Sequence, residues 1–81
     1  MSFIKIEPVR AIKLNGKTYR SARQAALAYA DAATGQFYYN CHQKGSVQLM
    51  PYIQYRAWAQ PIKEKFYRRS HKIFDRYFNG G

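Results

Sequence analysis

A row of positive charges in the C-terminal third of the chain has the spacing needed to contact a polyanion. Its members recur at intervals of four, three and four residues, which places them on one side of a helix: Lys65, Arg69, Lys72 and Arg76, with Arg68 beside them. Such a row can follow a phosphate backbone and release its condensed counterions. The same pattern also fits a solvated outer face whose long stems cover apolar surface, or an anionic membrane surface.

A second group of side chains with recognition chemistry lies between residues 37 and 45. Asn and Gln can pair bidentately with adenine, and exposed tyrosines can stack on the unpaired bases of RNA. The residues predicted to contact nucleic acid here are Tyr38, Tyr39, Asn40, His42, Gln43 and Lys44. The two tyrosines fit a place in the core equally well.

Metal binding and catalysis find little support in the residue types. Cys41 and His42 are adjacent and His71 is distant, whereas a structural zinc site needs four convergent ligands. No nucleophile has an identifiable base beside it. We therefore predict that the protein is not an enzyme and uses no cofactor or metal, and that Cys41 is a buried small hydrophobe.

Charge is the strongest compositional feature of the 81-residue chain. Fourteen Lys and Arg stand against four acidic residues, for a formal net charge of +10, and 17% of the residues are aromatic. Self-repulsion at this level is relieved by a polyanionic partner. Nucleic acid is the favoured partner, and an anionic membrane or an acidic protein patch is the alternative. The aromatic content argues against disorder.

The length predicts one small domain without a membrane-spanning segment. The sequence contains a single cysteine, and its first residues lack the long apolar core of a signal peptide. No apolar run approaches the length that crosses a bilayer. We expect a cytoplasmic protein whose fold does not depend on a disulfide.

The N-terminal part predicts strands and then a helix. Residues 3–14 alternate loosely with a break at Pro8, which favours two short strands. Asn15-Gly16 is a strong turn signal, so residues 17–20 should return as a hairpin. Ser21 then caps a helix over residues 22–33, whose stop is placed at Gly35. The expected inner face of this helix is Ala22, Ala25, Ala26, Tyr29 and Ala33.

The sequence after residue 35 is compatible with more than one secondary structure. Residues 36–44 fit either a strand or a short helix that ends at Gly45. Residues 47–58 look extended, and Pro51 confines them to an edge strand or a break. Pro61 suits the first turn of a helix, which gives a long amphipathic basic helix over residues 60–78.

Residues 12–58 contain a short motif. Asn15, Gly16, Lys17, Tyr19 and Ser21 are followed by the alanine pair at 25–26, a turn at 34–35 and a second segment ending at Gly45. This pattern resembles the small helix-turn-helix DNA-binding repeat attached to phage and intron homing endonucleases. The segment before Gly45 is aromatic where that family has a Ser/Thr-rich helix start, and the C-terminal basic helix has no counterpart there.

The resemblance implies a recognition mode for residues 12–58. The second helix would enter the major groove and present the residues of 38–44 to the bases. Lys17, Arg20 and Arg23 would brace the phosphate backbone, which sets register without conveying sequence.

Together these observations predict an α+β domain with an N-terminal β-hairpin, a helix-turn-helix-like middle, a short edge strand and a long C-terminal basic helix. The function that fits best is DNA binding, with RNA as an option. A second hypothesis is a small phage-type inhibitor or adaptor that docks on a host nucleic-acid-processing enzyme, because Tyr, Trp and Arg are the usual interface anchors. The oligomeric state is left open.

Overall fold

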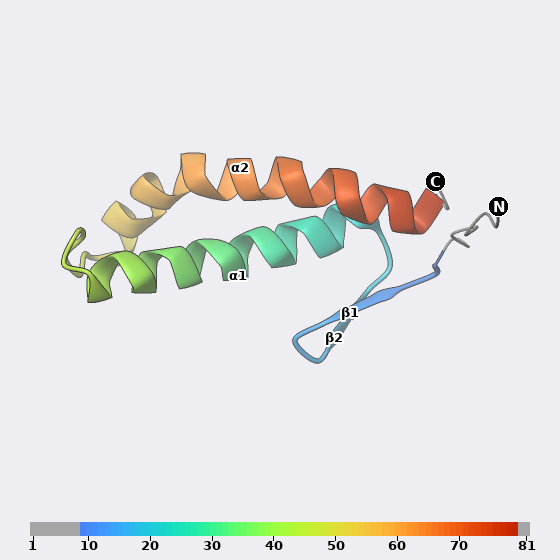
Figure 1. Cartoon of the computed structure of the whole chain (residues 1–81), viewed down its shortest axis with the longest axis horizontal. Coiled ribbons are helices and arrows are strands. Elements are labelled where there is room, and N and C mark those ends of the chain that lie inside the picture. The colour runs from blue at the N-terminus through green and yellow to red at the C-terminus, as the bar shows by residue number, and fades with distance from the viewer. Residues whose placement is uncertain (1–8, 80–81) are drawn as a thin grey trace, which may run out of the picture.

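The computed structural model of the protein describes residues 9–79. A two-stranded antiparallel hairpin precedes two long helices that lie side by side (Figure 1): β1 Ile12–Leu14, β2 Lys17–Tyr19, α1 Ala22–Gln43 and α2 Tyr52–Asn79. The expectation of an α+β chain that begins with a hairpin is confirmed at this coarse level. The strand predicted before Pro8 lies outside the described residues.

The hairpin forms as its turn residues predict. Asn15 and Gly16 have φ angles of 50° and 82°, the left-handed conformations that a two-residue hairpin turn requires. Ile12 pairs with Tyr19 and Leu14 with Lys17, so each pair shares one face of the ribbon. Ile12, Leu14 and Tyr19 are half-buried on the side that contacts α1, whereas Lys13 is exposed.

α1 begins at the predicted residue and extends beyond the predicted end. The Ser21 hydroxyl accepts a hydrogen bond from the Gln24 backbone N–H at 3.1 Å, as the capping pattern indicates. The helix then continues through Gly35 to Gln43. The predicted turn at residues 34–35 was therefore wrong, and the two expected helices of a helix-turn-helix are one helix.

α1 ends where the helical alternative for residues 36–44 placed its end. Gly45 has a φ angle of 79°, its N–H donates to the His42 carbonyl, and the Ser46 N–H donates to the Cys41 carbonyl. This is the Schellman arrangement, in which a left-handed glycine closes a helix. Gly35 costs the helix only about 1 kcal/mol relative to alanine, which the packing of the following aromatic residues on α2 offsets.

Residues 47–58, predicted to be extended, form a loop as far as Pro51 and then the first turns of α2, which begins before the predicted basic helix. The carbonyl of Pro51 accepts from the Tyr55 N–H at 2.9 Å, so the proline directly precedes the helix instead of interrupting a strand. Pro61 lies inside α2, not in its first turn. It leaves the carbonyl of Ala57 without an N–H partner, and this is tolerated because Ala57 is exposed to solvent.

Small side chains form the contact between the antiparallel helices. Ala26, Ala30 and Thr34 are buried on α1 at four-residue intervals, and Ala59 and Ser70 are buried on α2. The hydroxyls of Thr34 and Ser70 donate to the carbonyls of Ala30 and Phe66 at 2.6 and 2.7 Å, so neither is left without a partner.

The predicted inner face of α1 was correct for Ala22, Ala25 and Ala26, which are buried. It was wrong for Tyr29, which is 45% exposed, and Ala33 is half-buried. The stripe that meets α2 is rotated towards Ala30 and Thr34, because only small residues fit where the two helices are closest. No helix within residues 9–79 combines the length and apolar character needed to span a membrane.

Gly35→Ala tests the continuity of α1. A Cβ at Gly35 meets no atom within 4 Å, so the substitution should raise the free energy of unfolding by about 0.5–1 kcal/mol, as in any unstrained helix interior. Gly45→Ala is the matched control, because its positive φ should make the same change destabilising by about 1–2 kcal/mol. Urea denaturation followed by circular dichroism measures both; a destabilising Gly35→Ala would contradict a continuous helix.

Candidate nucleic-acid interface

The cationic line, which we define as Lys65, Arg69, Lys72 and Arg76, lies along one side of α2. All four residues are exposed. The line is about 16 Å long, because each helical residue advances the axis by about 1.5 Å. None of the four side chains forms an ion pair with another described residue. The predicted grouping of these cations on an outer face agrees with their positions in the structure.

Two nearby cations differ from the cationic line because acids partly neutralise them. Arg68 lies 3.4 Å from Glu64 one turn earlier in α2, and Lys63 lies 3.3 Å from Asp31 on α1. Both pairs are solvent-exposed, so each contributes little to stability.

The predicted phosphate-bracing residues gather at one end of the molecule. Lys17, Arg20 and Arg23 are all exposed, in β2, after β2 and in the first turn of α1. The first turn of α1 lies beside the last turns of α2, since the helices are antiparallel and Tyr29 contacts Phe74 edge-to-face at 6.2 Å. Arg20 and Arg23 are therefore at the same end as Arg76.

Residues 38–44 are at the other end of α1. The distance along the helix axis from Arg23 to Asn40 is about 25 Å. The structure therefore does not bring the predicted base-contacting residues next to Arg20 and Arg23, because a continuous α1 separates them. Tyr39, Asn40, Gln43 and Lys44 are exposed, and the Asn40 side chain accepts a hydrogen bond from Gln36 at 3.1 Å.

Tyr38 and His42 hold the loop between the helices. The Tyr38 hydroxyl accepts from the Met50 N–H at 3.0 Å and donates to the Gln48 carbonyl at 3.4 Å. The His42 Nδ1 lies 3.2 Å from the carbonyl of Val47. Both residues are half-buried, so the structure gives them a role in fixing this loop.

An aromatic cluster joins α1 to the first turns of α2. The ring of Phe37 stacks on Trp58 at 6.0 Å, and Tyr38 meets Tyr55 edge-to-face at 4.9 Å and Trp58 at 5.4 Å. Burial raises the pKa of Tyr55, with a smaller contribution from the negative charge of Asp31. Tyr55 and Trp58 are three residues apart and therefore lie on the same side of a helix, so the helical conformation of this segment lets both rings contact α1.

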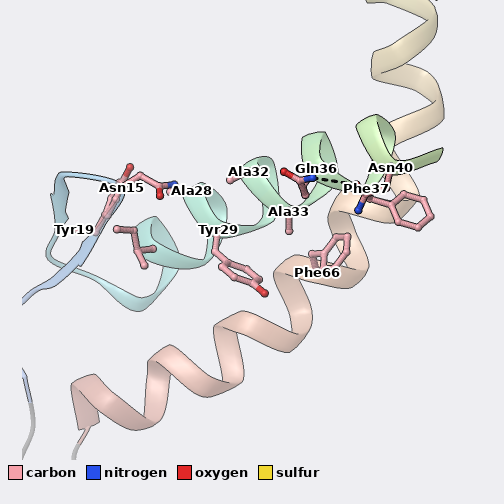
Figure 2. Close-up of a pocket in the computed structure, with 11 residues that line it drawn as sticks. Asn15, Tyr19, Ala28, Tyr29, Ala32, Ala33, Gln36, Phe37, Asn40 and Phe66 are labelled. Atoms are coloured by element: carbon pink, nitrogen blue, oxygen red, sulfur yellow. Dashed lines mark hydrogen bonds between the residues drawn. The ribbon is translucent and has the colours of Figure 1, made fainter. Parts of the chain in front are cut away.

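A groove that the sequence did not predict lies between the hairpin and the two helices. Tyr29, Phe37 and Phe66 line it, together with alanines of α1 (Figure 2). The spacing of Tyr29, Ala33 and Phe37 at four-residue intervals was the available signal, but it predicts a core face as readily as a groove. Within residues 9–79 no three His, Cys, Asp or Glu side chains converge as a metal site would require.

Tyr38→Phe tests whether this tyrosine supports the loop. Removing its hydroxyl leaves the Met50 N–H without a partner and should lower the free energy of unfolding by about 1 kcal/mol. Tyr39→Phe is the control, because Tyr39 is 57% exposed and should change stability by less than about 0.5 kcal/mol. Thermal denaturation of the two variants measures the difference; equal stabilities would contradict the assigned role.

Comparison with family models, curated proteins and solved structures finds no match to this chain. The resemblance of residues 12–58 to the homing-endonuclease repeat therefore stays a prediction.

Proposed function

We propose that the protein binds nucleic acid, in the first place duplex DNA, through contacts between phosphates and the cationic line on α2. The observation that supports this function is the exposure of Lys65, Arg69, Lys72 and Arg76 on one side of a single helix without ion-pair partners among the described residues. A net charge of +10 adds long-range attraction to any polyanion.

The spacing of the cations suits a phosphate backbone. Neighbouring members of the cationic line are about 4.5–6 Å apart along the helix axis. Their long, flexible side chains can adjust this spacing to that of successive phosphates on one strand. Arg20 and Arg23 extend the positive surface beyond Arg76 at the end of the molecule. Four phosphate contacts to duplex DNA would give a salt slope of about −3.6 in log K against log[salt].

Contacts of this kind predict binding with little sequence preference. Phosphate contacts fix position and orientation but convey no base identity. Asn40 and Gln43, whose amides can read adenine, are at the end of α1 and not on the cationic line. The proposal therefore keeps the predicted DNA partner and the predicted backbone contacts, but does not depend on a recognition helix.

Removing two cations of the line tests the proposal. Lys72→Ala with Arg76→Ala should reduce the magnitude of the salt slope for a 20-base-pair duplex by about 1.8, because two counterion-releasing contacts are lost. The matched control is Lys13→Ala with Arg56→Ala, which removes the same charge from exposed positions outside the line. Fluorescence anisotropy titrations at four salt concentrations measure the slopes.

The control should leave the slope within about 0.5 of the wild-type value, since its residues make no phosphate contact in the proposal. Equal losses in the two double variants would mean that net charge, and not the cationic line, attracts the duplex. An affinity that does not vary with salt would exclude phosphate contacts altogether. Parallel titrations with single-stranded RNA of equal length test whether the partner is RNA instead. Tighter binding to this RNA than to the DNA duplex would show that it is.

A further inference from the structure

An open groove lies between the hairpin and the helices. It has a volume of about 700 Å³ and is bounded by Leu14 and Tyr19 of the hairpin, Tyr29 and Phe37 of α1, and Phe66 of α2. Figure 2 shows Ala28, Ala32 and Ala33 along the α1 side of the groove. The small size of these alanines creates the depth that larger side chains would fill.

Large apolar side chains remain exposed along this groove. Tyr29 and Phe37, which line it, are 45% and 42% exposed. Ile73, which is 54% exposed, lines a neighbouring depression on α2. Single exposed hydrophobic residues are ordinary on a protein surface, but a contiguous apolar surface in a concave position is typical of an interaction site.

Two apolar depressions continue the groove along α2. One is lined by Phe37 and Ile62, and the other by Tyr29 and Ile73; Phe66 and Arg69 border both. The α2 residues that line the second depression follow those of the first by about four positions, which corresponds to about 6 Å along the helix axis. Side chains at positions i and i+4 of a bound helix have this separation.

The charges around the groove indicate which kind of partner it binds. Lys65 and Arg69 stand at the edge of the depressions, and no Asp or Glu lines the groove or either depression. A second copy of the chain would bring another +10 of charge to this surface, which like-charge repulsion disfavours. A partner with acidic residues beside its apolar ones is attracted to the same place.

We propose that the groove binds an acidic amphipathic helix of another protein. Two apolar side chains of that helix, four residues apart, occupy the depressions on either side of Phe66 and Arg69, in the helix-in-groove mode. Asp or Glu residues next to them pair with Lys65 and Arg69. The groove extends about 18 Å along α1 from Ala28 to Asn40, which accommodates about 12 helical residues.

This docking site is separable from the surface proposed to bind nucleic acid. Lys65 and Arg69 belong to both, whereas Lys72 and Arg76 line neither the groove nor the depressions. An acidic helix and a duplex would therefore compete for two cations of α2, although each has contacts that the other lacks. The inference does not depend on the proposed function.

A selection from a library of random 16-residue peptides displayed on phage tests the proposal directly. The wild-type protein is the target, and Ala32→Arg, which fills the groove, serves for counter-selection. Ala32 is exposed, so the substitution should not disturb the helix contact. Ala57→Arg adds the same side chain to an exposed position of α2 that lines neither the groove nor its depressions, and it is the matched control.

The enriched peptides should be acidic and carry large apolar residues four positions apart. In fluorescence anisotropy, Ala32→Arg should weaken their binding at least about tenfold and Ala57→Arg by less than about twofold, because only the former fills the groove along which the peptide helix lies. Arg69→Glu should weaken binding similarly through like-charge repulsion. Lys72→Ala with Arg76→Ala should leave peptide affinity unchanged while it weakens duplex binding.

Three results would overturn the docking proposal. The first is enrichment of peptides without acidic residues, or of peptides that bind Ala32→Arg as well as wild type. The second is a dimer in sedimentation equilibrium that Ala32→Arg dissociates, since the groove would then be occupied by a second copy. The third is loss of duplex affinity in Ala32→Arg, which would assign the groove to nucleic acid.

Discussion

The contact of α1 with α2 through small side chains is the interaction on which the rest of the structure depends. Every buried apolar residue in the described part of the chain is an alanine, and the buried polar residues Thr34 and Ser70 are also small. Small residues allow two helix backbones to approach closely, but each contributes little apolar area. A chain of this size has a thin core in any case. The aromatic cluster of Phe37, Tyr38, Tyr55 and Trp58 supplies the larger contact area at the loop end.

This arrangement leaves large side chains at the edges of the helix pair. Tyr29 and Phe66 line an open groove beside the contact, and Ile73 lines the depression next to it. The hairpin adds the third wall and is fastened at its start by the Val9 N–H, which donates to the Tyr77 carbonyl at 2.9 Å. α2 consequently has an apolar side towards the groove and the cationic line next to it, and these are the two surfaces from which function is inferred.

Residue chemistry alone did not reveal the structural contacts of Tyr38 and His42. Tyr38 and His42 have groups that can recognise bases, yet in the structure they bind loop carbonyls and an N–H. The cations were easier to predict, because Lys and Arg are seldom buried and a periodic row of them on a helix must face solvent. The groove could not be predicted, because it is formed by three elements that are separated in the sequence.

Local interactions account for the parts of the fold that the sequence by itself determined. The Asn15-Gly16 turn, the Ser21 cap, the alanine-rich start of α1 and the Gly45 end depend on residues within a few positions of one another. Tertiary structure decided the course of the chain at Gly35 and between Pro51 and Pro61. Glycine and proline inside a helix cost about 1 and 3 kcal/mol, and propensity therefore favoured a turn, a strand and a later helix start. Packing of Tyr55, Trp58 and Ala59 against α1 outweighs these local costs. The packing energy comes from residues that are distant in the sequence, so local propensities do not include it.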